Sequence, residues 1–168
     1  MNIEQSKDPL ARYASMQSFQ PGALDLDAPR IWIPQASGVY FSPILFHVTQ
    51  GYYVNLLRVE RSGVLSRHRH AGPVHAFTLR GTWRYLEHSW TARAGDYVFE
   101  PPGEAHTLVL PEQAGEMITL FHVTGGYSYL NSEGEIVGFE DVFTKLAAAR
   151  AHFSANDLSE EDFAKLVR

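Results

Sequence analysis

Three histidines in this chain stand at spacings that suit a single divalent metal ion. His68 and His70 are two residues apart, and His106 closely follows the turn-forming segment 101–103. In a β-strand, residues i and i+2 point to the same face, so the first two histidines can reach one ion from one strand. Three neutral imidazoles bind a transition metal ion and leave open coordination positions for water, substrate or O₂. The spacing therefore predicts a metal site that can also be an active site.

Four further side chains near these histidines are candidates for catalysis or substrate binding. Glu100 directly precedes the turn and is a candidate general base, the alternative being a solvated carboxylate at a strand end. His75 is a candidate catalytic residue, as a fourth ligand or as a hydrogen-bond donor to substrate, or else it only packs. Trp83 and Tyr85 lie two apart on one strand face, where they either line a pocket for an aromatic substrate or fill the barrel core.

The elements that must position these side chains are strands. From about residue 38 to about residue 138, short apolar or alternating runs rich in β-branched and aromatic residues recur between glycines and prolines. This pattern predicts an all-β barrel over residues 38–138. Residues 1–37, rich in Pro, Asp, Gln and Ser, are predicted to form an N-terminal arm with one short strand at residues 30–34.

The hydrophobic pattern changes period after the barrel. Apolar residues then follow the helical spacing i, i+3, i+4, i+7, at Phe139, Val142, Phe143, Leu146, Ala149 and Phe153. We therefore predict a C-terminal helical extension over residues 139–168. Its first helix should be capped near Glu140 or Asp141, and a second short helix should follow Ser159.

The composition narrows the class of protein. A chain of 168 residues with 45% apolar residues is long enough for one folded domain with a real core. The net charge of −5 gives no support for a nucleic-acid or membrane-surface partner. The absence of cysteine excludes disulfides, thiolate ligands and cysteine nucleophiles. With no long apolar run and a polar start, the sequence predicts a soluble, cytoplasmic protein.

At these residues the sequence resembles the cupin superfamily. The first cupin motif is matched by Gly63-x4-His68-Arg-His70-x4-His75-x5-Gly81, and the second by Gly95-x5-Pro101-Pro-Gly103-x2-His106-x3-Leu110. The resemblance implies a double-stranded β-helix, or jelly-roll barrel. The glutamate ligand of the family is replaced by His75 and its final asparagine by Leu110. Loss of that glutamate implies a neutral three-histidine site, which would leave the ion its full charge and favour anionic ligands such as an enolate.

Among cupins without this glutamate, the segment 68–87 most resembles the 2,4'-dihydroxyacetophenone dioxygenase family, and acetylacetone-cleaving dioxygenase is a more distant functional relative. Membership would imply a non-haem Fe(II) ion bound by His68, His70 and His106. It would also imply cleavage of a C–C bond of an aryl α-hydroxyketone by O₂, giving a carboxylate and formate. Zn, Ni or Mn are alternative metals, because imidazole ligands suit several ions. The expected partners are a small aromatic ketone, O₂ and further copies of the chain in a homodimer or homotetramer.

Two other functions remain open at the level of sequence. One is a non-catalytic metal-binding sensor, like the cupin domain of certain zinc-binding anti-sigma factors. The other is a metal-dependent cupin enzyme with different chemistry, such as an isomerase or a lyase. Consumption of O₂ separates the dioxygenase from both alternatives, since neither of them needs O₂ as a substrate.

Overall fold

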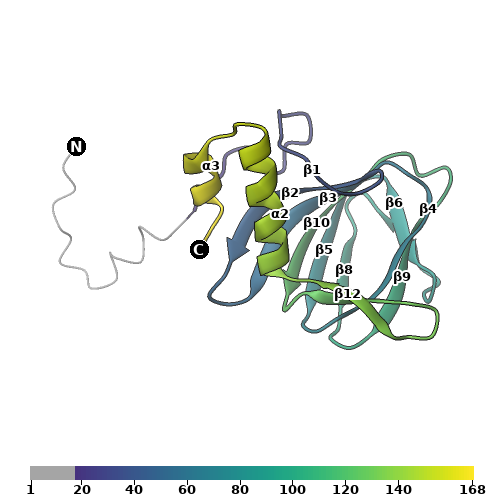
Figure 1. The fold of residues 1–168 in the computed structure, drawn as a ribbon. Helices are drawn as coiled ribbons and strands as arrows, with labels where there is room; N and C mark the ends of the chain where they lie inside the picture. The colour runs from purple at the N-terminus through teal and green to yellow at the C-terminus, as the bar shows by residue number, and fades with distance from the viewer. Residues whose placement is uncertain (1–17) are drawn as a thin grey trace, which may run out of the picture.

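Two antiparallel sheets form the body of the computed structural model, which describes residues 18–168 (Figure 1). One sheet has the order β1-β2-β3-β10-β5-β8, with β1 (Ile33–Ala36), β2 (Val39–His47), β3 (Tyr52–Val59), β10 (Met117–Thr124), β5 (Val74–Arg80) and β8 (Tyr97–Glu100). The other has the order β12-β11-β4-β9-β6-β7, with β12 (Ile136–Glu140), β11 (Tyr127–Leu130), β4 (Gly63–His70), β9 (Ala105–Leu110), β6 (Thr82–Tyr85) and β7 (Ala92–Arg93). This arrangement confirms the all-β jelly-roll barrel expected from the sequence.

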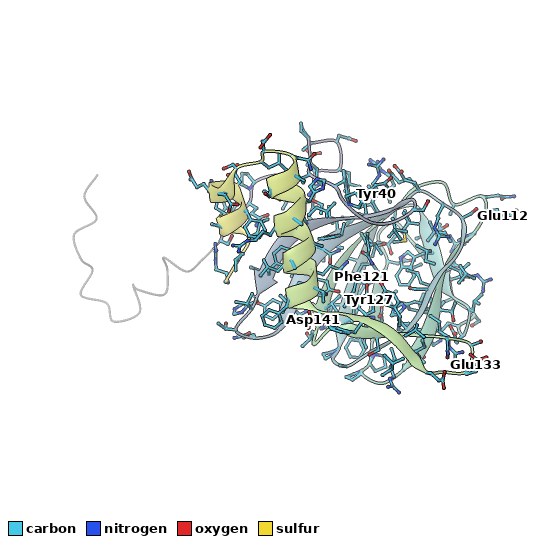
Figure 2. All side chains as sticks on the ribbon, viewed as in Figure 1. Tyr40, Glu112, Phe121, Tyr127, Glu133 and Asp141 are labelled. Carbon is cyan, nitrogen blue, oxygen red and sulfur yellow. The ribbon has the colours of Figure 1, made fainter. Side chains whose placement is uncertain are left out.

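The core lies between the two sheets and is built from the inward side of each strand. In β3 the buried residues include Tyr53, Leu56 and Val59. The central strand β10 pairs with β3 on one side and with β5 on the other, and most of its residues are buried. Figure 2 shows Phe121 and Tyr127, from β10 and β11, in the interior between the sheets. Burial of these large aromatic and β-branched side chains is the main stabilising term of such a fold.

The N-terminal part of the described chain joins the barrel. The short strand predicted at residues 30–34 is present slightly later, as β1, which pairs with the start of β2 through partners such as Ile33 and Phe41. The first sheet therefore begins within the predicted arm. Residues 1–17 of that arm lie outside the described residues.

Both predicted C-terminal helices are present. Helix α2 (Val142–Ala155) begins after Asp141, whose carboxylate accepts hydrogen bonds from the backbone N–H groups of Phe143 and Thr144. The assignment of Phe139 to this helix is wrong, because Phe139 lies in β12, where it pairs with β11 and is exposed. Helix α3 (Glu160–Lys165) begins after Ser159, as expected. Within residues 18–168, neither helix has the length and hydrophobicity that crossing a bilayer requires.

Helix α2 packs at one end of the barrel, beside β1, β2 and β12 (Figure 1). Its buried residues include Val142, Ala149 and Phe153, together with one charged residue, Lys145. After α3 the chain end returns to β2, where the backbone N–H of Phe46 donates to the carbonyl of Leu166 at 2.7 Å. The C-terminal segment is thus tied to the sheet and fixes α2 against the barrel.

The tight connection between β5 and β6 requires glycine at position 81. Gly81 has a φ of +73°, and a Cβ there would lie 2.2 Å from the carbonyl oxygen of Glu116. Gly95 has a φ of +96° but no atom within 4 Å of a Cβ. We expect Gly81→Ala to lower the free energy of unfolding by about 3 kcal/mol and Gly95→Ala by only about 1 kcal/mol. Urea unfolding of both variants measures the difference, and equal losses would contradict the backbone contact as its cause.

Candidate metal centre

His68 and His70 point into the barrel from β4. The strand alternates between exposed and buried residues at this end, so Arg67 and Arg69 are exposed while the two histidines are buried. The hydroxyl of Ser66 lies 3.2 Å from Nδ1 of His68. A hydrogen bond at one ring nitrogen orients the other, and Nε2 of His68 is thereby directed toward the interior.

His106 reaches the same point from β9. Strands β4 and β9 pair so that His68 and His106 are direct partners, and their Nε2 atoms lie 3.2 Å apart. The predicted turn before His106 is present, and the N–H of Gly103 donates to the carbonyl of His70 at 2.9 Å. The ring of Tyr85 stacks on the ring of His106 at 3.8 Å and holds it in place. The three predicted histidine ligands are therefore brought together, with His106 almost completely buried.

Glu100 completes the group from the end of β8. Its side chain is only 2% exposed, because this residue points inward where Tyr97 and Phe99 of the same strand point outward. Its Oε2 lies 3.2 Å from Nε2 of His70 and 3.4 Å from Nε2 of His106. Its Oε1 accepts a hydrogen bond of 2.7 Å from the hydroxyl of Tyr85. Burial raises the pKa of Tyr85 well above its usual value, so this tyrosine stays a donor.

The four donor atoms fit one divalent metal ion. One ring nitrogen of each of His68, His70 and His106 and one oxygen of Glu100 lie within 4.8 Å of one another. Ligands about 2.1 Å from a common ion lie about 3.0 to 3.4 Å from their neighbours, which matches the shorter distances above. Among residues 18–168, Oε2 of Glu100 has no hydrogen-bond partner although it is buried. A buried carboxylate oxygen without a partner is costly, and a cation at this point would satisfy it.

The protonation of the histidines also suits a metal. Burial lowers the pKa of His68 well below its usual value, and the neighbouring His70 and His106 lower it further. Burial also lowers the pKa of His106, although Glu100 opposes this shift. Neutral imidazoles keep the lone pair that a metal ion needs.

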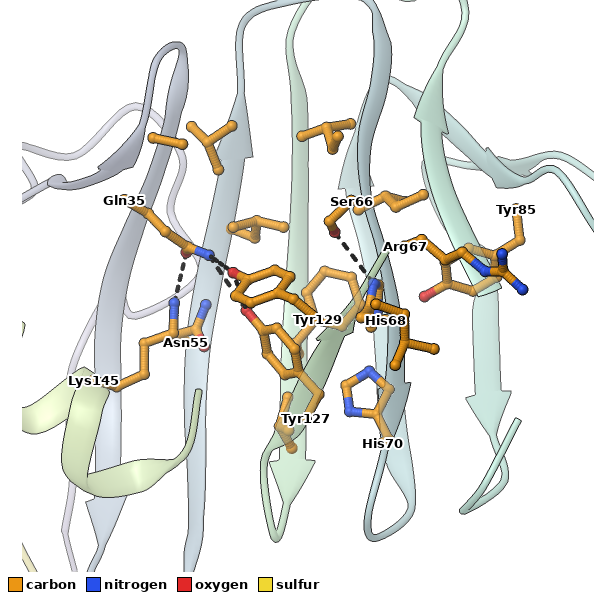
Figure 3. Close-up of a pocket in the computed structure, with 18 of the residues that line it drawn as sticks. Gln35, Asn55, Ser66, Arg67, His68, His70, Tyr85, Tyr127, Tyr129 and Lys145 are labelled. Carbon is orange, nitrogen blue, oxygen red and sulfur yellow. Dashed lines mark hydrogen bonds between the residues drawn. The ribbon is translucent and has the colours of Figure 1, made fainter. Parts of the chain in front are cut away.

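The group opens onto a cavity of about 400 Å³ between the sheets (Figure 3). His68, His70 and Tyr85 line one part of it. Much of the wall is apolar, contributed by Val39, Leu57, Leu65, Leu108, Phe121, Val123, Leu130 and Val137. A cavity of this volume and character suits a small organic ligand.

Comparison with known proteins identifies the family. Residues 26–127, more than half of the chain, match the model of the ChrR cupin-like domain family. The chain belongs to this cupin family. No curated protein matches the sequence of this cupin. Solved structures with the same fold include an RmlC-like cupin from Ralstonia eutropha JMP134, with 25% identity, a TM-score of 0.79, and coverage of 88% of this chain and 94% of that one.

Two other solved structures share the fold at lower identity. A cupin-like protein of unknown function from Ralstonia eutropha JMP134 has 24% identity and a TM-score of 0.68, with coverage of 71% of this chain and 75% of that one. An acetylacetone dioxygenase from Acinetobacter johnsonii has 17% identity and a TM-score of 0.65, with coverage of 74% of this chain and 91% of that one. At these identities the likeness shows the fold alone.

The neutral three-histidine site expected from the sequence differs from the donor group that the structure of this cupin brings together. Its donor group contains a carboxylate, because Glu100 contributes Oε2 from β8. The sequence motif led to the opposite expectation, since His75 occupies the position of the family's glutamate in the first motif. The carboxylate instead comes from the strand that pairs with β5, where Glu100 lies opposite Val74. The charge of a bound divalent ion would be partly balanced within this group.

The other predicted site residues do not all lie at the donor group or the cavity. Tyr85 lines the cavity, whereas Trp83 is fully buried beside it and donates from Nε1 to the hydroxyl of Thr78 at 2.8 Å. His75 is not brought to the donor group. It lies on the outward side of β5, where its Nδ1 is 2.8 Å from the hydroxyl of Tyr97. Its neighbours on either side in the strand, Val74 and Ala76, take the inward positions.

The cavity also contains polar residues that sequence reasoning missed. Gln35, Asn55, Tyr127, Tyr129 and Lys145 line it together with the histidines (Figure 3). One signal was available in the sequence, because the pair at 127 and 129 has the same i, i+2 spacing as the histidine pair. The register of β11 with β4 then sets these tyrosines opposite His70 and His68.

The metal-free protein should lose stability in mild acid. The pKa values of His68 and His106 are lower in the folded protein than the usual 6.5, so the unfolded chain binds protons first as the pH falls. The unfolding free energy is therefore highest above about pH 6.5 and decreases below it, by up to about 1.4 kcal/mol per pH unit for each such histidine. Urea unfolding at about pH 7.5 and pH 5.5 measures this slope. His68→Gln should reduce it, and a slope unchanged in this variant would contradict the assignment.

Proposed function

We propose that this cupin is a non-haem Fe(II) dioxygenase that cleaves a C–C bond of an aryl α-hydroxyketone, or of a related diketone, with O₂. The observation that carries the proposal is the buried group of three histidines and Glu100 at the wall of a largely apolar cavity. The shared fold of an acetylacetone dioxygenase is consistent with this chemistry. His68, His70, His106 and Glu100 would hold the ion, which would supply Lewis acidity and the electrons that O₂ chemistry needs.

The overall reaction consumes one molecule of O₂ for each molecule of ketone. The bond between the carbonyl carbon and the hydroxymethyl carbon breaks, both carbons are oxidised, and O₂ is reduced. The products are an aryl carboxylic acid and formic acid, each with one oxygen atom from O₂. No further reductant is required, so the reaction balances with the two substrates alone.

The side chains of the site have distinct roles in this proposal. Glu100 takes a proton from the substrate, since it is the carboxylate at the donor group and is held by Tyr85 through its other oxygen. The stacked ring of Tyr85 keeps His106 in position. The apolar cavity wall excludes water and leaves room for an aromatic ring.

A non-catalytic role in metal sensing is the second candidate. The family model that matches residues 26–127 is that of the ChrR cupin-like domain, which favours keeping this alternative. A sensor would bind the metal at the same four residues but would not turn over a ketone.

Isotope labelling separates the two candidates. The Fe(II)-loaded protein is mixed with 2,4'-dihydroxyacetophenone under ¹⁸O₂, and the products are analysed by mass spectrometry. The dioxygenase predicts 4-hydroxybenzoate and formate, each with one labelled oxygen atom, and no product from His106→Ala. Protein that retains iron but forms no product would contradict the proposal for this substrate, and absence of O₂ uptake with hydroxyketones and diketones alike would favour the sensor.

A further inference from the structure

A second polar cluster lies in the same cavity as the metal centre, and helix α2 contributes to it. Lys145 of this helix is only 4% exposed and lines the cavity (Figure 3). Its Nζ donates to Oε1 of Gln35 at 2.6 Å and pairs with Oε2 of Glu140 at 2.9 Å. Because burial of an unpaired ammonium group is costly, these two partners are what allow Lys145 to stay in the interior.

Tyr127 of β11 connects this cluster to the metal centre. The ring of Tyr127 lies 5.1 Å from the rings of both His68 and His70, measured between centroids. The hydroxyl of the same residue donates to Oε2 of Glu140 at 2.6 Å. One phenol side chain thus spans the distance between the histidines and the polar cluster. A para-hydroxyphenyl group lying beside it in the cavity would span a similar distance.

The cluster has donors that its internal hydrogen bonds do not use fully. The amide of Gln35 donates to the hydroxyl oxygens of both Tyr127 and Tyr129, at 3.3 and 3.2 Å. The proton of Tyr127 goes to Glu140, so within residues 18–168 the hydroxyl of Tyr129 is left with a long hydrogen bond of 3.3 Å to Tyr127 and a weaker contact with the same carboxylate. Asn55 is buried, and it lines the cavity. Both groups can therefore bind a ligand atom.

The charge of the cluster selects the kind of ligand group. The buried Lys145 forms an ion pair with the partly buried Glu140, so the cluster carries no net charge. A second carboxylate would add an unbalanced charge to this interior, whereas a neutral hydroxyl can accept from Tyr129 and exchange hydrogen bonds with the amide of Asn55. Burial also raises the pKa of Tyr129, which keeps its proton available.

We propose that Asn55, Tyr129 and the Lys145–Gln35 pair form a subsite for a hydroxyl group at the far end of the ligand whose other end occupies the metal centre. This inference rests on the proposed function and makes it more specific. The ligand has oxygen atoms at both ends of an apolar, planar middle. Residues outside the histidine motifs, one of them on the C-terminal helix, then determine which ketone binds.

A pair of probes tests this subsite by affinity instead of turnover. 2,4'-Dihydroxyacetophenone and 2-hydroxyacetophenone differ only in the ring hydroxyl, and calorimetry under nitrogen measures the dissociation constant of each for the full-length Fe(II)-loaded protein. We expect the hydroxylated probe to bind about tenfold more tightly. Tyr129→Phe and Asn55→Ala should each reduce this ratio to about twofold or less, with little change for the other probe. Tyr97→Phe, at an exposed tyrosine on the outward face, should keep the full ratio.

The outcomes distinguish this subsite from the function on which it rests. If both probes bind and the ratio is the same in wild type, Tyr129→Phe and Asn55→Ala, the cluster only anchors α2 and the subsite is overturned. If neither probe binds to wild-type protein that retains iron, the subsite and the proposed substrate class are both overturned. Loss of the ratio in the two variants, with iron content unchanged, supports the subsite.

Discussion

Replacing His106 by alanine is expected to lower the iron content of the Fe(II)-loaded protein from about one ion per chain to less than a tenth of that value. The reason is that His106 supplies one of four donor atoms and lies directly opposite His68 on the neighbouring strand. Without it the ion loses one ligand, and the stacked ring of Tyr85 cannot replace it. Elemental analysis after anaerobic desalting measures the iron that remains.

The matched control for this variant is His75→Ala. His75 belongs to the same sequence motif as His68 and His70, but it lies on the outward side of β5 beside Tyr97. We expect this variant to retain iron at the wild-type level. Loss of iron in His75→Ala together with retention in His106→Ala would show that the ion binds at another place.

Replacing Glu100 by glutamine is expected to weaken Fe(II) binding by more than about 100-fold. Residues that only orient a ligand typically contribute about 10- to 100-fold in affinity, and a charged ligand should contribute more. Tyr85→Phe removes the hydrogen bond to Oε1 of Glu100 and should weaken Fe(II) binding about tenfold. Competition with a chromophoric chelator under nitrogen measures both affinities.

Glu104→Gln is the control for the change at Glu100. This neighbouring carboxylate lies in the connection before β9, pairs with His88, and is not one of the four donor residues. Its substitution should leave iron affinity unchanged. If Glu100→Gln binds iron with wild-type affinity, Glu100 is not a ligand, and the neutral three-histidine site that the sequence motif favours is supported instead.

The strands, and the shared face of His68 and His70, could be predicted because their signals are local. Alternation along one strand places His68 and His70 on the same face, whatever the rest of the barrel does. Likewise, the helix start at Asp141 depends only on a side chain and the backbone that directly follows it. The pairing of β4 with β9, which sets His106 opposite His68, is a property of the whole barrel that no local pattern determines.

The role of position 75 could not be read from the motif. A turn at residues 71–73 separates β4 from β5, and a turn resets which of two alternating positions faces the core. Val74 therefore takes the inward position, and His75 faces outward. The carboxylate comes from β8 by sheet pairing, so the sequence offers Glu100 as a candidate base but does not place it in the donor group. The position of Lys145 at the cavity could not be predicted either, since a single lysine in an amphipathic helix usually faces solvent.

A crystal structure of the Fe(II)-loaded protein, with anomalous data collected at the iron edge, would locate the ion relative to the four donor residues. We expect one strong peak between the strands, within bonding distance of Nε2 of His68, His70 and His106 and of Oε2 of Glu100. A peak on the outward face of β5, or one bound by the histidines while Glu100 points elsewhere, would contradict this expectation.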